Sequence, residues 1–142
     1  MIEDFRYRYR FLSNFAYAEV TLDGVQYATV EHAYQAAKCS DPVYRQRIQD
    51  AKTPGDAKRI GNTAYLRKDW QKVKIAIMYD LVRQKFKQPT LQKALLDTES
   101  EELIEDNPWG DTFWGVCKGA GENHLGKILM AVREEIKRES LT

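Results

Sequence analysis

The chain has 142 residues, of which 43% are hydrophobic and 30% are charged, and its formal net charge is +1. This size and composition are typical of one globular domain with a core of its own. The near-neutral charge gives no support for binding of nucleic acid or of an anionic membrane through bulk electrostatics. No apolar run approaches the roughly 18 residues that a membrane-spanning helix needs.

The sequence also lacks the marks of secretion and of zinc binding. The residues MIEDFRYRYR at the beginning are charged and aromatic and contain no apolar segment of the kind a signal peptide has. Cys39 and Cys117 form no Cys-x-x-Cys pair, and the two histidines also lie far apart. We therefore expect a cytoplasmic protein without a metal, and we interpret both thiols as small buried apolar groups.

The first predicted element is a β-hairpin over residues 19–28. The Asp-Gly pair at 23–24 is a favoured two-residue turn, because both positions tolerate positive φ. A helix is predicted next, from residue 29 or 30 to about residue 39. It contains the segment EHAYQAAK, residues 31–38.

Two further helices begin with the same combination, a capping side chain followed by proline. Asp41-Pro42 opens one helix, and Thr53-Pro54 opens another that Gly61 can end. Proline suits the first helical position because its missing N–H would have no partner there. The sequence therefore predicts two short helices between residues 42 and 61.

Three later helices are predicted from apolar residues three and four positions apart, which share one helical face. The first follows Asp69, the second covers PTLQKALLDT, and the third covers LGKILMAVREEI. The fold class that follows is mainly α (α+β), with a short β-hairpin near the N-terminus. The apolar positions are, helix by helix, Trp70, Val73, Ile77 and Leu81; Leu91, Leu95 and Leu96; and Leu125, Ile128, Leu129, Val132 and Ile136.

The segment EHAYQAAK places an acid, an amide and an amine on one side of a helix. Glu31, Gln35 and Lys38 lie at positions i, i+4 and i+7. Burial raises the pKa of a carboxyl group and a nearby lysine lowers it, so Glu31 is a candidate acid or base. The alternative is a solvated polar surface. His32 lies on a different stripe, and we interpret it as a buried structural histidine.

Two segments have neither a helical nor a strand period. One is FLSNF, residues 11–15; the other is residues 107–126, which contain two tryptophans and five glycines. Glycine-rich backbone with aromatic side chains favours a ligand-facing loop, and turns covered by core tryptophans are an equal alternative. Asn123 is interpreted as the cap of the last helix.

Taken in order, these segments resemble the YbiA-like or NADAR family, over about residues 5–137. The family outline is a Ser-Asn-Phe segment, a Glu-His-x-x-Gln-Ala-x-Lys helix, a tryptophan that opens a long helix, an Asp-x-x-Trp-Gly loop, and Asn-x-Leu-Gly before a final helix. The matching residues are Ser13-Asn14-Phe15, Glu31-His32, Gln35-Ala36, Lys38, Trp70, Asp111, Trp114-Gly115, Asn123 and Leu125-Gly126.

The resemblance implies a compact, multihelical single domain over residues 1–142 and a hydrolase of the N-glycosidase class. Characterised family members cleave a ribosyl C–N bond, some in riboflavin biosynthesis intermediates and others in ADP-ribosylated guanine. We expect phosphoribosylamino-pyrimidine intermediates of riboflavin biosynthesis as the substrate. The alternatives are an ADP-ribosyl hydrolase acting on guanine adducts, in nucleic acid or free, or on NAD-like molecules, and a non-catalytic ADP-ribose or nucleotide-binding module.

The resemblance also implies roles for individual residues. Cleavage of a ribosyl C–N bond builds positive charge on the sugar, which a carboxylate stabilises. The division of labour between the two acids is left open, and no metal or organic cofactor is expected. The expected catalytic residues are Glu31 and Asp111, and the expected substrate-binding residues are Asn14 and Gln35 for hydroxyls or base edges, Lys38 for phosphate, and Trp70 and Trp114 for stacking.

Overall fold

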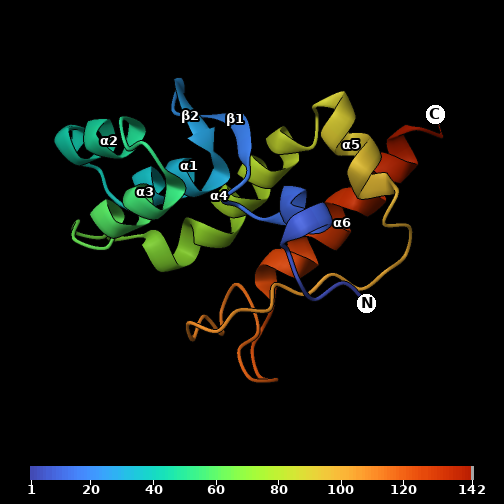
Figure 1. Cartoon of the computed structure of the whole chain (residues 1–142). Coiled ribbons are helices and arrows are strands. Elements are labelled where there is room, and N and C mark those ends of the chain that lie inside the picture. The colour runs from blue at the N-terminus through green and yellow to red at the C-terminus, as the bar shows by residue number, and fades with distance from the viewer. Residues whose placement is uncertain (142) are drawn as a thin grey trace. The chain divides into compact units, whose positions relative to one another are not determined.

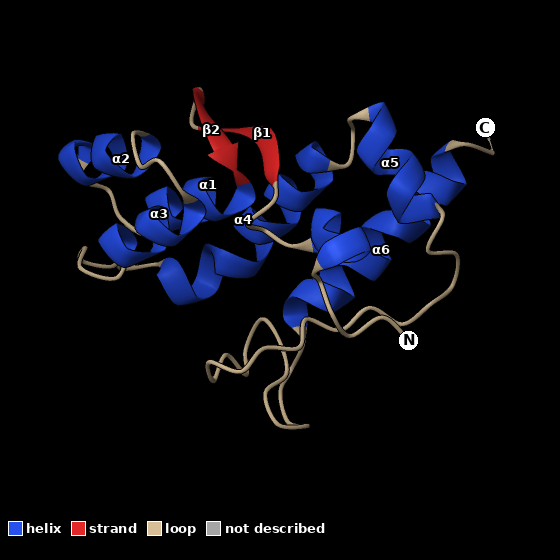
Figure 2. Ribbon diagram, in the orientation of Figure 1, coloured by secondary structure: helices blue, strands red, loops and turns tan. Residues whose placement is uncertain are grey.

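The structure is a computed structural model that describes residues 1–141 (Figure 1). About half of the chain is helical, and the described residues contain one two-stranded sheet (Figure 2). The predicted mainly α (α+β) class is therefore confirmed. The elements in chain order are η1 (Tyr7–Leu12), β1 (Tyr17–Leu22), β2 (Val25–Thr29), α1 (Val30–Ala37), α2 (Pro42–Gln49), α3 (Pro54–Gly61), α4 (Trp70–Lys85), α5 (Pro89–Leu96) and α6 (His124–Glu139).

The chain divides into two units. One is Asn14–Lys85, which holds the hairpin and α1 to α4. The other combines Met1–Ser13 with Phe86–Thr142 and holds η1, α5 and α6. Each unit is described separately below.

The hairpin of the first unit agrees with the prediction and extends slightly beyond it. Strands β1 and β2 pair antiparallel, with Leu22 opposite Val25. The turn residues Asp23 and Gly24 have φ of 51° and 79°. Positive φ at both positions is what a two-residue hairpin turn requires, because its twist then matches the twist of the strands.

The two caps predicted in this unit, Asp41 and Thr53, are present, and Thr29, predicted only as a possible first residue of the helix, is a third cap. The side chains of Thr29, Asp41 and Thr53 each accept a hydrogen bond from a backbone N–H two or three residues later, at 2.9–3.0 Å. Proline follows the cap in α2 and in α3. Each cap satisfies one backbone donor that the helix cannot, which is worth about 1 kcal/mol.

Helix α1 is the centre of the first unit. It contacts the hairpin, α2, α3 and α4, and all eight of its residues are buried (Figure 1). Of the α4 stripe that was predicted to face the core, Trp70 and Leu81 are buried, but Val73 and Ile77 are only half-buried. The remaining buried positions of α4 include Met78, Val82 and Lys85.

In the second unit, helix α6 supplies most of the apolar core. All five of its predicted core positions are buried. In α5 only Leu95 is buried, and the other two predicted leucines are half-buried. Residues 107–123 form an irregular segment, as predicted, which is held by short backbone bridges such as Asp106 to Val116 and Cys117 to Ala120.

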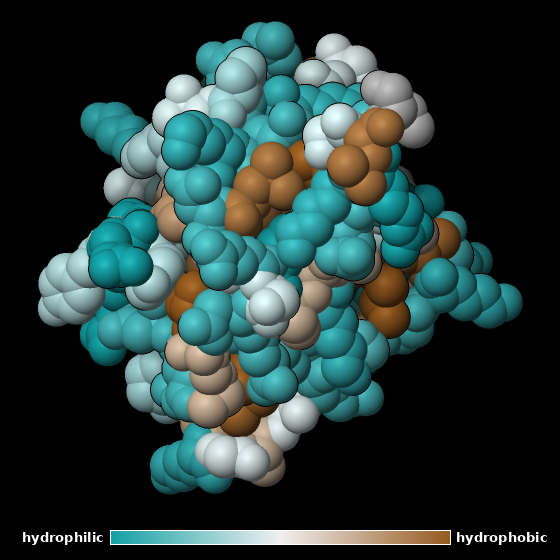
Figure 3. Space-filling model, turned by 90° about the vertical axis from the view of Figure 1, so that its right-hand side faces the viewer, coloured by the Kyte–Doolittle hydropathy of each residue, from teal (hydrophilic) through white to brown (hydrophobic). Residues whose placement is uncertain are grey.

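The face shown in Figure 3 is mainly hydrophilic, with hydrophobic side chains in small separate groups. Among residues 1–141, no helix combines the length and the apolar character needed to cross a membrane. Both cysteines are free thiols; Cys39 is buried as expected, whereas Cys117 is half-buried, so the expectation of full burial was wrong for Cys117.

Candidate active site

The predicted polar side of α1 is a connected chain of hydrogen bonds. Glu31 and Gln35 are only 8% and 2% exposed. The Gln35 Nε2 donates to Glu31 Oε2 at 2.6 Å, and the Lys38 Nζ donates to Gln35 Oε1 at 2.9 Å. The alternative of a solvated surface is therefore wrong for Glu31 and Gln35. The Gln35 amide thus bridges the ammonium group of Lys38 and the carboxylate of Glu31.

Lys38 is the last residue in this series of hydrogen bonds, and it has a second amide partner. Its Nζ donates to Asn62 Oδ1 at 3.4 Å and lies 6.0 Å from the centre of the Tyr34 ring. Burial lowers the pKa of Lys38; Lys58 adds to this effect, and Glu31 opposes it. Because burial removes water from the ammonium group, an anion that reaches Lys38 would meet a poorly hydrated cation. Asn62 was not predicted as part of this site.

Gly61, the last residue of α3, makes room for the Gln35 side chain. A Cβ atom at position 61 would lie 2.1 Å from Gln35 Oε1 and 2.9 Å from Gln35 Cβ. Any other residue would therefore collide with the amide that joins Glu31 to Lys38. The sequence predicted Gly61 only as the end of a helix, because nothing in the sequence pairs residue 61 with residue 35.

Asn14 is joined to α1 through its backbone. The Glu31 N–H donates to the Asn14 carbonyl oxygen at 3.1 Å, and Asn14 Nδ2 donates to Met78 Sδ at 3.5 Å. The segment FLSNF and the helix that carries Glu31 are therefore adjacent at this point. The predicted contact of the Asn14 amide with a ligand stays a prediction.

His32 is a structural residue, as the sequence analysis proposed. The ring is fully buried, with Nδ1 at 2.7 Å from Thr29 Oγ1 and Nε2 at 3.0 Å from the Ala51 carbonyl oxygen. A carbonyl oxygen only accepts, so the proton must lie on Nε2, and Nδ1 then accepts from the Thr29 hydroxyl. Nε2 thus fixes α1 to residue 51, and Nδ1 holds the Thr29 side chain that caps α1.

Trp70 is 4% exposed and packs against Tyr34, with ring centres 5.2 Å apart. These are the contacts of a core side chain. Little of the indole surface is accessible for a ligand to stack on. The predicted stacking role of Trp70 stays a prediction, and a test of it is given below.

Asp111 and Trp114 belong to the second unit, where they lie in one tight loop. Asp111 Oδ1 accepts from the N–H groups of Phe113 and Trp114 at 3.1 and 2.9 Å, and the Asp111 N–H donates to Asn107 Oδ1 at 3.0 Å. The Trp114 ring stands edge-on to Phe113, 4.8 Å between centres. One carboxylate oxygen of Asp111 thus holds the loop in shape.

Asn123 is the N-cap residue of α6, as predicted, but its side chain makes no capping hydrogen bond. Its Oδ1 accepts from the Glu105 N–H and its Nδ2 donates to the Leu103 carbonyl oxygen, both at 2.9 Å. The residue has a left-handed backbone, with φ of 54°. Its amide fastens the start of α6 to the segment at 103–105.

The candidate site residues thus form two groups, one in each unit. Asn14, Glu31, Gln35 and Lys38 are joined by the hydrogen bonds around α1. Asp111 and Trp114 are joined in the other unit. Within residues 1–141, no cluster of three or more His, Cys, Asp or Glu side chains is placed to hold a metal ion.

Comparison with known proteins places this arrangement in a family, because the NADAR domain matches residues 3–137. The chain belongs to the NADAR domain family. An N-glycosidase of Nostoc punctiforme is 42% identical over 136 residues, which cover 91% of this chain and 86% of the relative. The N-glycosidase YbiA of Escherichia coli is 36% identical over 130 residues, covering 89% of this chain and 81% of the relative.

The fold agrees with that of a solved NADAR-family relative. The NMR structure of E. coli YbiA matches with a TM-score of 0.82 and 38% identity, over 94% of this chain and 81% of that chain. A riboflavin biosynthesis protein of Vibrio vulnificus is 37% identical over 134 residues, but these are only 36% of its length. The predicted family is confirmed, and the relatives named N-glycosidases are hydrolases.

Proposed function

We propose that this NADAR-family chain is an N-glycosidase that hydrolyses a ribosyl C–N bond in a phosphorylated ribosyl compound. The observation that carries the proposal is the buried Glu31 carboxylate, which the Gln35 amide holds in place with Lys38 behind it. The names of the relatives, N-glycosidases at 36–42% identity, support the same reaction.

In this proposal Glu31 stabilises the transition state. As the C–N bond breaks, the sugar becomes an oxocarbenium-like cation, and a carboxylate beside C1 either stabilises that charge or activates the attacking water. The hydrogen bond from Gln35 fixes the orientation of the carboxylate. A fixed charge acts more strongly than a mobile one because it needs no reorganisation during the reaction.

Lys38 is the proposed partner of the phosphate. Lys38 follows Glu31 by seven positions, which corresponds to about 10 Å along a helix axis. Lys38 already donates to two amide oxygens, and an ammonium group has three N–H donors, so one remains for a ligand. The proposed substrate therefore extends along α1 from its reacting C–N bond to its phosphate.

Asp111 is proposed as the second carboxylate, and one substitution separates its charge from its structural role. Asp111→Asn retains an Oδ1 that can accept from the N–H groups of Phe113 and Trp114. The loop should therefore keep its shape while the negative charge is lost. A large fall in turnover with unchanged unfolding would support the catalytic role, and unchanged turnover would refute it.

For the substrate itself, we propose phosphoribosylamino-pyrimidine intermediates of riboflavin biosynthesis. The support is that relatives of 37% and 40% identity, in Vibrio vulnificus and Zea mays, are named riboflavin biosynthesis proteins. This chain spans only 36% and 20% of those two proteins. The substrate therefore needs a direct test against the ADP-ribosyl alternative.

The test is a product assay by mass spectrometry on wild type, Glu31→Gln and Glu19→Gln. Glu19 is an exposed glutamate of β1 in the same unit, so its substitution is a matched control. We expect ribose 5-phosphate from the pyrimidine intermediates, lost in Glu31→Gln and unchanged in Glu19→Gln. Release of free ADP-ribose from ADP-ribosylated guanosine would instead make ADP-ribosyl compounds the substrate class. Near wild-type turnover by Glu31→Gln would refute the role of Glu31.

A further inference from the structure

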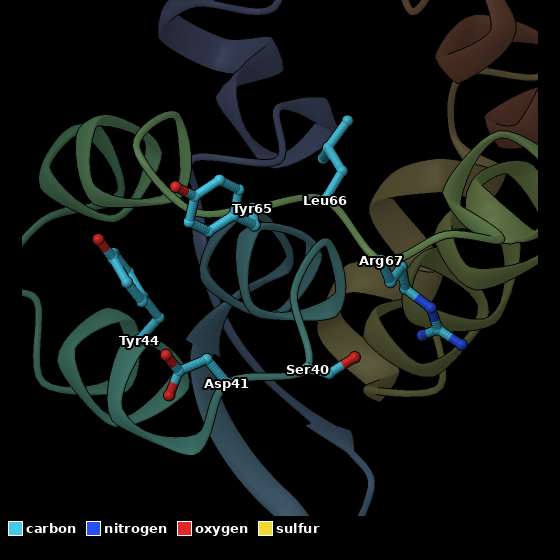
Figure 4. A pocket seen from close by; sticks show the side chains of 6 residues that line it. All are labelled: Ser40, Asp41, Tyr44, Tyr65, Leu66 and Arg67. Atoms are coloured by element: carbon cyan, nitrogen blue, oxygen red, sulfur yellow. The ribbon is translucent and has the colours of Figure 1, made fainter.

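Two places in the fold carry polar groups that the proposed reaction does not use. One is a groove of about 220 Å³ in the unit of residues 14–85, beside the C-terminal end of α1. Its lining presents the hydroxyls of Ser40, Tyr44 and Tyr65 together with the Asp41 carboxylate (Figure 4). Hydroxyls can meet donors and acceptors alike, so the groove indicates no single ligand chemistry. The other place is the loop of Asp111 in the second unit, where the hydrogen bonds have a definite order.

Asn107 closes the loop that contains Asp111. The residue is only 3% exposed, and its backbone N–H donates to the Val116 carbonyl oxygen at 2.9 Å. Its Nδ2 donates to the Asp111 carbonyl oxygen at 2.9 Å, and its Oδ1 accepts from the Asp111 N–H at 3.0 Å. The side-chain amide therefore pairs with both backbone groups of Asp111, as a residue of a neighbouring antiparallel strand would.

The Glu105 carboxylate fixes which way the Asn107 amide faces. Asn107 Nδ2 also donates to Glu105 Oε2, at 3.1 Å. A flipped amide would set its oxygen against this carboxylate and its NH₂ group against the Asp111 N–H. Gly115 leaves space for the pair, because a Cβ there would lie 1.8 Å from Glu105 Oε2 and 2.7 Å from Asn107 Nδ2. Glu105, Asn107 and Gly115 thus form one support for Asp111.

The Asp111 carboxylate that results has one oxygen bound and one oxygen available. Oδ1 accepts from the N–H groups of Phe113 and Trp114, which fixes the side-chain rotamer, and Asn107 fixes the backbone. Asp111 is half-buried, and in the part of the chain that the structure describes no group bonds to its Oδ2. Oδ2 is therefore held in one direction without a partner of its own.

We propose that Asn107 is a positioning residue, which holds Asp111 so that Oδ2 can accept a hydrogen bond from the substrate. This inference rests on the proposed role of Asp111 as the second carboxylate. A carboxylate oxygen only accepts, so the group that it meets is an O–H or N–H donor, such as a ribose hydroxyl. Asn107 acts through Asp111, because its own amide is buried and already makes three hydrogen bonds.

The test compares Asn107→Asp with Thr98→Val. Asn107→Asp keeps an acceptor for the Asp111 N–H, but an oxygen then faces Glu105 Oε2 and the Asp111 carbonyl oxygen. Thr98→Val removes a buried hydroxyl of the same unit whose hydrogen bonds lie outside this loop. With phosphoribosylamino-pyrimidines as substrate, we expect Asn107→Asp to lower kcat about 10- to 100-fold, as a misplaced catalytic group does, with little change in KM. Thr98→Val should leave kcat unchanged.

A double variant shows whether Asn107 acts through Asp111. If it does, Asn107→Asp should lower kcat no further once Asp111→Asn is present. Two reductions that multiply, or a wild-type kcat in Asn107→Asp, would overturn the proposal. Should Asn107→Asp fail to fold, Asn107→Ser is measured in the same way, because serine adds no charge to the loop.

Hydrogen exchange separates this inference from the proposed function. Exchange of the Phe113 and Trp114 N–H groups, followed by NMR, reports whether Asp111 still holds them. We expect faster exchange of these two groups in Asn107→Asp and wild-type exchange in Thr98→Val. If Asp111→Asn kept wild-type turnover, the proposed role of Asp111 would fail, while faster exchange in Asn107→Asp would still support Asn107 as the residue that holds Asp111. Unchanged exchange would overturn the inference whatever the kinetics show.

Discussion

Replacement of Gly61 by alanine should break the hydrogen-bond chain on α1. The new Cβ would lie 2.1 Å from Gln35 Oε1 and 2.9 Å from Gln35 Cβ, whereas ordinary contacts begin at 3.4 Å. The amide end of Gln35 can rotate away, but its Cβ is fixed by the α1 backbone. The two helices must therefore separate by about half an ångström at this point, and the contacts with Glu31 and Lys38 are lost.

The expected magnitude follows from those contacts. Gln35 makes two hydrogen bonds to charged groups, at 2.6 and 2.9 Å, and such bonds contribute about 1.5–3 kcal/mol each. Water can replace part of the lost hydrogen bonding once the helices separate. We therefore expect a loss of stability of about 1–3 kcal/mol, which is typical of overpacking. Turnover should fall by a larger factor than KM rises, because Glu31 loses its fixed orientation.

Gly55 provides the matched control in the same helix. A Cβ at position 55 would meet only Thr53 Oγ1, at 3.8 Å, which is an ordinary contact. Gly55→Ala should therefore leave turnover unchanged and stabilise the protein by up to about 1 kcal/mol, because alanine favours the helix. The same substitution at two positions six residues apart should thus have opposite effects on stability.

The assays are urea unfolding of both variants and steady-state kinetics on whichever substrate the product assay identifies. If Gly61→Ala matched Gly55→Ala in stability and turnover, the argument from the close approach to Gln35 would be refuted. A second check combines Gly61→Ala with Gln35→Ala, which removes two of the three closest atoms. The double variant should lose less stability than the sum of the two single variants.

Three more predictions concern the buried His32 and Trp70 and the half-buried Lys38 of the same unit. His32→Ala should lower the free energy of unfolding, measured in urea, by about 2–4 kcal/mol, because two hydrogen bonds are lost and a cavity is left. A 100-fold fall in turnover at unchanged stability would contradict the structural role of His32. Burial lowers the pKa of Lys38, so a phosphorylated ligand should lose affinity at a lower alkaline pH than it would with an exposed lysine. Lys38→Arg should move this loss of affinity to a higher pH. Identical pH profiles of KM for the wild type and Lys38→Arg would refute the contact between Lys38 and the phosphate. Trp70→Phe should lower the Tm with little change in KM because the indole is 4% exposed, and a tenfold rise in KM at unchanged Tm would instead establish the stacking role.

Features set by neighbouring residues were predicted well from the sequence. The Asp-Gly turn and the caps at Asp41 and Thr53 act over two to four residues, so the sequence alone locates them. The spacing of Glu31, Gln35 and Lys38 likewise follows from helix geometry, and the structure joins these side chains as the spacing indicated.

Features that depend on distant residues were not predictable in the same way. Periodicity shows which residues of α4 share a face, but which neighbouring stripe is buried depends on the elements packed against it. Asn123 has the right residue type for a cap, yet backbone groups of Leu103 and Glu105 take its amide. The approach of Gly61 to Gln35 likewise requires knowledge of how α3 packs against α1.

The complete burial of α1 restricts how this protein can change during evolution. The helix that carries Glu31 and Gln35 is also the element against which the hairpin and three other helices pack. Selection for folding and selection for chemistry therefore fall on the same eight positions, and few substitutions there satisfy both. The exposed side chains of Tyr65 and Leu66 carry no such double constraint. New ligand preferences would arise most readily there, while the chemistry on α1 stays unchanged.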